Sequence, residues 1–164
     1  MEDEYINLLR LFHEQGVEYV VIGGYAVAAH GFPRYTDDLD VLLDATPANA
    51  QRVLEVMYRL GYVHGEVEEA DFTVQPSFVS ISLNGRKVDL MTQVLGVTFA
   101  ECRHEAPAIT TNGLPVRFVN LAALRRNKAA TGRPKDLDDL ENLPPVADPP
   151  PPPQSGSAPP WPGL

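Results

Sequence analysis

Two runs of sequence decide how the chain is organised: VVIGG at residues 20–24 and RYTDDLDV at residues 34–41. The first is apolar and rich in β-branched residues, which is typical of a buried strand, and it breaks at two glycines. The second opens with acidic residues and passes into a new apolar run. Between them, residues 24–30 predict a short helix that Pro33 prevents from continuing. We therefore expect a strand–helix–strand unit with acidic side chains on its second strand.

Asp38 and Asp40 are two positions apart on that second strand, so their side chains project from the same face while Leu39 and Val41 point into the core. Two carboxylates that close together repel each other unless a cation lies between them. The alternative is a polar pair on a solvent-facing strand, but aspartate is depleted in strands and such a pair is costly. The pattern favours a metal site. Asp37 precedes the apolar alternation and is expected in the turn.

Gly23 and Gly24 stand at the corner between the first strand and the helix. Glycine lets the backbone approach a ligand closely, and the start of a helix favours anions. A tight turn without any ligand is the alternative. The position after a buried strand, and the thirteen residues between Gly24 and Asp38, favour phosphate binding. Together, the glycines and the carboxylates indicate a site for a metal-bound polyphosphate.

This arrangement resembles the nucleotidyltransferase superfamily of DNA polymerase β type. Members of that superfamily have Gly-Gly or Gly-Ser after a strand, Asp-x-Asp on the next strand and a third carboxylate on a later strand. The resemblance implies that the third carboxylate is Asp89, in the run RKVDLM at 86–91. Taken alone, Asp89 is equally compatible with an exposed strand position. The motifs GGYAV, HG, RYT and DLD are most similar to AbiEii-type nucleotidyltransferase toxins and their small relatives.

The resemblance implies a metal-dependent enzyme that moves a nucleoside monophosphate from Mg-NTP to an acceptor hydroxyl. In its two-metal scheme, Asp38, Asp40 and Asp89 bind two Mg²⁺ ions, or Mn²⁺ in their place. One ion orients the triphosphate and the other lowers the pKa of the attacking hydroxyl. Asp89 helps to take the proton of that hydroxyl, the hydroxyl attacks the α-phosphate, and pyrophosphate leaves.

Two residues between the motifs are candidates for nucleotide binding, Arg34 and Thr36. For Arg34 two roles are equally open, since its guanidinium is suited both to a phosphate and to a nearby carboxylate.

Two further candidates lie near the C-terminus, in the run NKAATGRPKDLDDL at 127–140. This run resembles the end of small AbiEii-type relatives, which implies that Lys128 and Lys135 contact the nucleotide phosphates as point charges. Asp136 and Asp139 are then expected to orient those lysines or to cap the last helix. The alternative for the whole basic patch is a solvated helix face.

The pattern of the remaining chain predicts an α/β fold, a short mixed sheet flanked by helices with a helical segment at the C-terminus. The nearly all-apolar run at 17–22 is expected to be a central strand. Asn-Gly pairs at 84–85 and 112–113 predict two β-hairpins. Helices are predicted at 3–15, 24–30, 47–60, 97–105, 121–131 and 135–143, and strands at 17–22, 38–43, 78–83, 86–91 and on both sides of 112–113.

Composition limits the domain count, the partners and the compartment. The 164 residues suffice for one domain, which we place at 1–143. Ten of the 21 residues at 144–164 are proline, so this tail is expected to be disordered or polyproline II-like. The formal net charge of −9 argues against a broad nucleic-acid surface, although basic residues gather near 125–135. The single cysteine, Cys102, and the absence of a signal-like or membrane-spanning run predict a cytoplasmic protein with no membrane partner.

Two classes of function follow. The first is a nucleotidyltransferase whose acceptor is an RNA or tRNA 3′ end, a small molecule or a protein side chain; the toxin resemblance adds a possible antitoxin partner. The second is a non-catalytic module that binds nucleotide or a protein partner. The presence of all three carboxylates counts against the second class.

Overall fold

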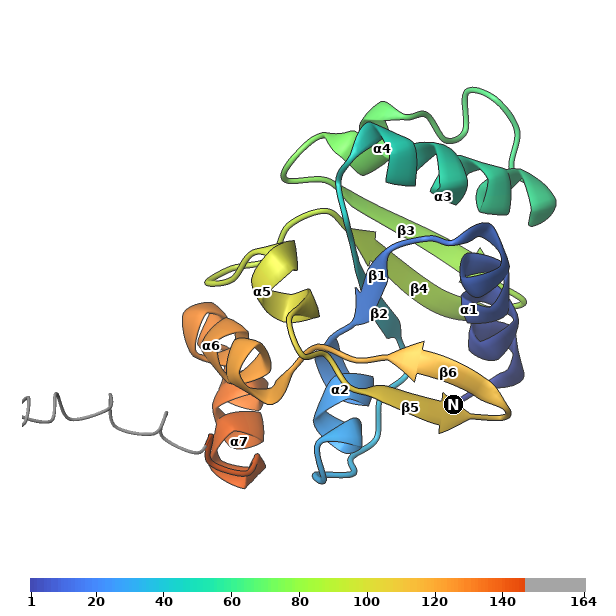
Figure 1. The fold of residues 1–164 in the computed structure, drawn as a ribbon. Coiled ribbons are helices and arrows are strands. Elements are labelled where there is room, and N and C mark those ends of the chain that lie inside the picture. The colour runs from blue at the N-terminus through green and yellow to red at the C-terminus, as the bar shows by residue number, and fades with distance from the viewer. Residues whose placement is uncertain (147–164) are drawn as a thin grey trace, which may run out of the picture.

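A four-stranded mixed sheet lies at the centre of the structure, a computed structural model that describes residues 1–146 (Figure 1). The strand order is β1 (Tyr19–Val21), β2 (Leu39–Leu43), β4 (Arg86–Met91) and β3 (Phe78–Leu83). β2 runs parallel to β4, whereas the β1–β2 and β3–β4 pairs are antiparallel. The predicted mixed α/β architecture is confirmed. The predicted tail lies outside the described residues from position 147 onward and stays a prediction.

The register of the sheet decides which side chains share a face. Asp40 lies opposite Asp89, and Leu39 and Val41 lie opposite Val88 and Leu90. The four apolar side chains are almost fully buried. Since side chains alternate along a strand, the two aspartates project from the other face.

Helices cover the sheet on two sides. Figure 1 shows α3 (Pro47–Arg59) and the short α4 (Ala70–Thr73) on one side, and α2 (Gly23–Ala29), α6 (Leu121–Thr131) and α7 (Pro134–Asn142) on the other. α1 (Asp3–Gln15) packs against α3 and buries an apolar stripe. It ends at Gly16, whose φ of 65° is the left-handed conformation that glycine adopts readily.

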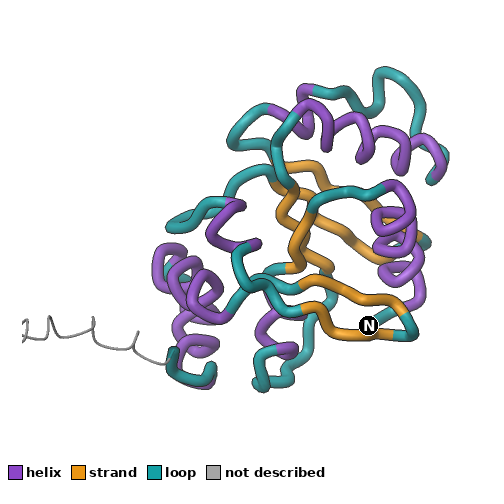
Figure 2. The backbone as a smooth tube through the Cα atoms, in the orientation of Figure 1, coloured by secondary structure: helices purple, strands orange, loops and turns teal. Residues whose placement is uncertain are grey.

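A second, two-stranded sheet consists of β5 (Ala108–Thr111) and β6 (Leu114–Arg117), joined by the predicted Asn-Gly turn. Figure 2 shows the strands of the four-stranded sheet at the centre of the molecule, with the β5–β6 hairpin toward the lower edge of the view. Among residues 1–146, no helix combines the length and the apolarity needed to cross a bilayer.

The expectation that residues 17–22 form a central strand is wrong. β1 lies at the edge of the four-stranded sheet. It is buried nonetheless, because the segment after β6 runs beside it: Val119 N–H donates to the Val21 carbonyl at 2.9 Å, and Val21 forms an isolated bridge with Phe118. An all-apolar run indicates that a strand is buried, but it does not indicate how many strands lie beside it.

The cap of α6 fixes that helix against its neighbour α5 (Phe99–Arg103). The Asn120 side chain accepts a hydrogen bond from Ala123 N–H at 2.8 Å. Its amide nitrogen donates to the carbonyls of Glu101 at 2.6 Å and His104 at 2.9 Å. After α6 the chain turns at Gly132, whose φ is 62°, and α7 folds back along α6. Both helices are thereby held at the sheet edge where α2 begins.

Candidate active site

A pocket of about 390 Å³ lies where α2 begins, beside the carboxylates of β2 and β4. We call it the glycine-corner pocket. All nine residues predicted as site residues line it, together with four that the sequence did not predict as ligands. The predicted residues are Gly23, Gly24, Arg34, Thr36, Asp38, Asp40, Asp89, Lys128 and Lys135, and the others are Asp37, Lys87, Arg133 and Asp136. The structure therefore brings these residues together, while their roles stay predictions.

The buried carboxylate at the pocket floor belongs to Asp89, which is only 6% exposed. Its Oδ1 atom has no hydrogen-bond partner among the described residues. A buried carboxylate oxygen without a partner is costly, and such a group in a native structure calls for an explanation such as an ion. Asp40 lies directly opposite on β2, and Asp38 immediately precedes that strand. The set offers only oxygen ligands, which suits Mg²⁺ or Mn²⁺.

Lys87 supplies the positive charge between these carboxylates. Its Nζ lies 2.7 Å from Asp89 Oδ2 and 3.6 Å from Asp38 Oδ2. Within residues 1–146, no three acidic, histidine or cysteine side chains are already spaced as a metal cluster. A divalent cation held by Asp38 and Asp89 would take the place of the Lys87 ammonium. The sequence analysis missed this residue, although residues 87 and 89 must share a face of β4.

The pKa of Asp40 is raised above its usual range. Burial raises the pKa of its carboxyl to about 6, and the nearby negative charges of Asp89 and Asp38 act in the same direction. At neutral pH this carboxylate is ionised in surroundings that disfavour the charge. Binding a cation there would relieve both the desolvation and the repulsion.

The glycines are required by close contacts within the site. Gly23 has a φ of 63°, and a Cβ atom at that position would lie 2.0 Å from Asp40 Oδ2. A Cβ atom at Gly24 would lie 2.5 Å from Thr36 Oγ1. The helix begins at Gly23 itself, one residue earlier than predicted. Any side chain at this corner would therefore push Asp40 or Thr36 out of place.

Behind the carboxylates, a buried ionic cluster joins α6 and α7 to the segment before β2. Lys128 is 4% exposed, and its Nζ lies 2.7 Å from Asp136 Oδ1 and 2.8 Å from Asp139 Oδ2. Arg34 donates to both oxygens of Asp139, through Nε at 2.6 Å and Nη2 at 2.9 Å. Of the two roles open for Arg34, the structure shows the ion pair. The solvated-face alternative is wrong for Lys128; for both residues, nucleotide contact stays a prediction.

Hydrogen bonds keep the acids of this cluster ionised. Burial alone would raise the pKa of Asp136, but donors from Arg133, Lys128 and Thr131 hold it well below its usual range. Burial likewise opposes ionisation of Asp139, and hydrogen bonds from Arg34 and Lys128 lower its pKa. Lys135, in the first turn of α7, is exposed to solvent in the same pocket.

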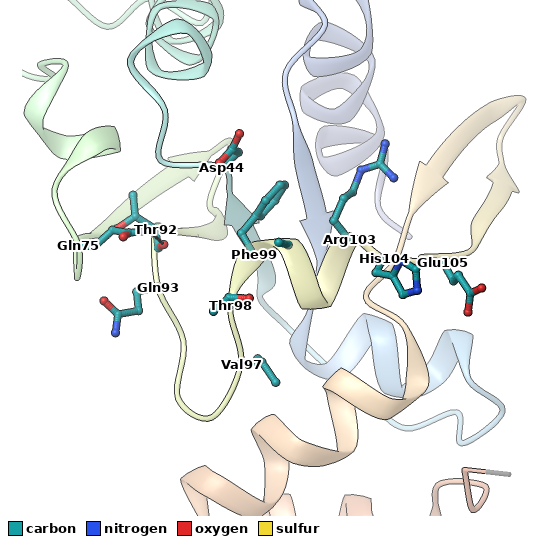
Figure 3. Close-up of a pocket in the computed structure, with 11 residues that line it drawn as sticks. Asp44, Gln75, Thr92, Gln93, Val97, Thr98, Phe99, Arg103, His104 and Glu105 are labelled. Carbon is teal, nitrogen blue, oxygen red and sulfur yellow. Dashed lines mark hydrogen bonds between the residues drawn. The ribbon is translucent and has the colours of Figure 1, made fainter. Parts of the chain in front are cut away.

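A larger cavity, of about 880 Å³, lies apart from these groups at the carboxyl ends of β2 and β4 (Figure 3). Its two acidic side chains, Asp44 and Glu105, lie well apart in that view. The Thr92 hydroxyl inside it is already satisfied, donating to Val74 O at 2.6 Å and accepting from Ser77 N–H at 2.8 Å. The residues that line this cavity include neither a glycine corner nor converging carboxylates, which are the features that the sequence predicts for the site.

No protein-family model matches the chain, and no curated protein matches it in sequence. Solved structures, however, match the chain in fold. TM1012 from Thermotoga maritima, an inferred nucleotidyltransferase, superposes with a TM-score of 0.58 at 19% identity, over 86% of this chain and 92% of its own. The chain has the nucleotidyltransferase fold.

Two antibiotic-modifying enzymes share that fold. The lincosamide antibiotic adenylyltransferase LnuA, solved with lincomycin bound, has a TM-score of 0.58 at 18% identity over 87% of this chain and 96% of its own. ANT(2'')-Ia, solved in complex with adenylyl-2''-tobramycin, has a TM-score of 0.54 at 18% identity over 84% and 83%. At these identities the likeness establishes the nucleotidyltransferase fold. The closer similarity to AbiEii-type toxins stays a prediction.

Replacing Lys128 with methionine should destabilise the protein by about 3–5 kcal/mol, because it leaves two buried carboxylates short of a cation. Urea unfolding followed by circular dichroism measures this. The matched control is Arg126→Met on the same helix, whose solvent-exposed ion pair with Glu101 at 3.0 Å should contribute far less to stability. Equal losses in the two variants would contradict the buried cluster's structural role.

Divalent-cation affinity should fall as the pH is lowered through about 6, the raised pKa of Asp40. Above that value Asp40 is ionised and can bind a cation; below it a proton competes. Calorimetric titration with Mn²⁺ should show affinity about fourfold weaker near pH 5.5 than near pH 7.5. Asp40→Asn should bind weakly at both values, with less dependence on pH. Equal wild-type affinities at the two pH values would contradict a role for Asp40 as a ligand.

Proposed function

We propose that the protein is a metal-dependent nucleotidyltransferase, which moves a nucleoside monophosphate from Mg-NTP to an acceptor hydroxyl. One observation carries this proposal: Asp40 lies opposite Asp89 beneath the Gly23 corner, and Asp89 Oδ1 is buried without a partner. The nucleotidyltransferase fold supports it, since solved proteins of that fold include adenylyltransferases.

The residues divide into three roles in this proposal. Asp38, Asp40 and Asp89 hold the divalent cations, which orient the triphosphate and lower the pKa of the acceptor hydroxyl. The corner at Gly23 leaves room for a phosphate to approach the backbone, and the exposed ammonium of Lys135 balances its charge. In this proposal Asp89 also accepts the proton of the attacking hydroxyl.

A small-molecule acceptor is the best supported of the three acceptor classes. LnuA was solved with lincomycin and ANT(2'')-Ia with adenylyl-2''-tobramycin, and both ligands are small molecules. The net charge of −9 disfavours a large RNA footprint. An RNA or tRNA 3′ end, a protein acceptor, an antitoxin partner and a cytoplasmic location rest on the sequence alone and stay predictions.

A non-catalytic binding module on the same fold is the second candidate. The observation in its favour is that Lys87 already neutralises Asp89 and Asp38. This candidate predicts nucleotide binding without transfer.

Label transfer separates the two candidates. The protein is mixed with Mg²⁺ and each α-labelled NTP, against lincomycin, tobramycin, a cell extract of small molecules, total RNA and cell protein. We expect label on a small molecule, and a loss of at least about 100-fold in Asp38→Asn/Asp40→Asn, because the cation ligands are gone.

The matched control is Asp44→Asn, which removes a carboxylate just beyond the other end of β2, in the separate larger cavity. It should retain wild-type transfer. Bound nucleotide with no transfer to any pool would favour the binding module. The absence of both nucleotide binding and transfer would overturn the proposed function.

A further inference from the structure

A second pocket, of about 520 Å³, continues from the same carboxylates toward β3. We call it the apolar-walled pocket. It shares Gly23, Asp40, Asp89, Lys128 and Arg133 with the glycine-corner pocket. The remaining residues that line it come from the residue after β1, from β3 and β4, from the loop at 92–98 and from α6, and they include Phe78, Met91, Leu95 and Asn127.

Part of its wall is apolar and open to solvent. Phe78 is 59% exposed and Leu95 is 60% exposed. Phe78 pairs with Met91 and Ser80 pairs with Asp89, so Phe78 projects from the same face of the sheet as the catalytic carboxylates. Exposed apolar side chains that adjoin a polar site are typical of a ligand-binding surface.

The wall that carries Leu95 is held in place by α6. The Leu95 carbonyl accepts a hydrogen bond from Asn127 Nδ2 at 2.9 Å. Gly96, with a φ of 80°, packs so closely that a Cβ atom there would lie 2.7 Å from the Ala130 Cβ. The pocket is therefore formed before any ligand arrives, which lowers the entropic cost of binding.

The cations that line this pocket are already engaged. Lys128 is paired with Asp136 and Asp139, and Arg133 Nε lies 2.6 Å from Asp136 Oδ2. A nucleic-acid acceptor needs free cations along its phosphates. The exposed Lys135 belongs to the glycine-corner pocket and not to this one. These charges favour phosphate on the Lys135 side of Asp89 and an uncharged, partly apolar group on the other side.

We infer that the apolar-walled pocket binds the acceptor, and that the acceptor is a small molecule which combines an apolar ring or chain with a hydroxyl presented to Asp89. This inference rests on the proposed function. The volume is within the range of small-molecule sites, roughly 300–1,000 Å³. Phe78 and Leu95 contact the apolar part, and Asp89, which lines both pockets, faces the hydroxyl.

The test compares matched alcohols as probes by ligand-observed NMR, with Mg²⁺ and a non-hydrolysable ATP analogue present. Benzyl alcohol, cyclohexylmethanol and phenyl β-glucoside carry an apolar group; ethylene glycol and methyl β-glucoside do not. We expect the apolar members to bind at least about tenfold more tightly. Equal binding of the two sets would overturn the inference.

Two variants test whether the alcohols bind in the apolar-walled pocket. Phe78→Ser and Leu95→Ser should each weaken binding of the apolar alcohols by about threefold to tenfold, and should weaken binding of the ATP analogue much less. The control is Val63→Ser, since Val63 is 59% exposed and does not line either pocket. It should leave both affinities at the wild-type value.

The failures of the inference and of the proposed function are distinguishable. If Phe78→Ser weakens the ATP analogue rather than the alcohols, the pocket holds the nucleobase; the inference is then wrong and the proposed function stands. If the wild-type protein binds no non-hydrolysable analogue of ATP, GTP, CTP or UTP with Mg²⁺, the proposed function fails, and the inference fails with it before any variant is made.

Discussion

The parallel pairing of β2 with β4 is the constraint on which the site depends. It sets Asp40 opposite Asp89, an arrangement in which two like charges destabilise a sheet. The opposite face maintains the register, because Leu39 and Val41 are buried against Val88 and Leu90. A slip of β2 by one residue would move Leu39 and Val41 off the core face and turn Asp40 toward the core, so the core enforces the unfavourable pair.

The repulsion between Asp40 and Asp89 affects the charged groups around them. The pKa of Asp40 is raised by burial and by its acidic neighbours, and Lys87 holds Asp89 in an ion pair. The second ionic cluster is built on Lys128 and has its own pair of acids. It balances Asp136 and Asp139, and it ties α6 and α7 to Arg34. The Lys128 cluster keeps α6 and α7 in place. The Asp40–Asp89 pair leaves Asp89 Oδ1 free for a ligand.

Local sequence was sufficient for the strand–helix–strand unit and for the location of the carboxylates. Hydrophobic periodicity, the Gly23-Gly24 pair and Pro33 each act over a few neighbouring residues. They can therefore be interpreted without knowledge of the fold. The Asn84-Gly85 turn also fixed the β3–β4 register, which set Phe78 beside Met91 on the face of Asp89. That consequence, like the position of Lys87 two residues before Asp89, was available from the sequence and was missed.

Other features depended on contacts between distant segments. Lys128 is buried because α7 folds back over α6, and no pattern within α6 itself reports that packing. The edge position of β1 follows from strand order, which hydrophobic periodicity does not encode. The apolar-walled pocket requires β3, the loop at 92–98 and α6 to meet, and it became recognisable only in three dimensions.

The most direct test of the central claim is a crystal structure with Mn²⁺ and a non-hydrolysable NTP, in which anomalous scattering locates the metal. The account predicts Mn²⁺ at about 2.0–2.2 Å from carboxylate oxygens of Asp40 and Asp89, with Lys87 moved off Asp89 and the phosphates at the Gly23 corner. A metal bound elsewhere, or Lys87 still paired with Asp89 beside a bound nucleotide, would contradict it.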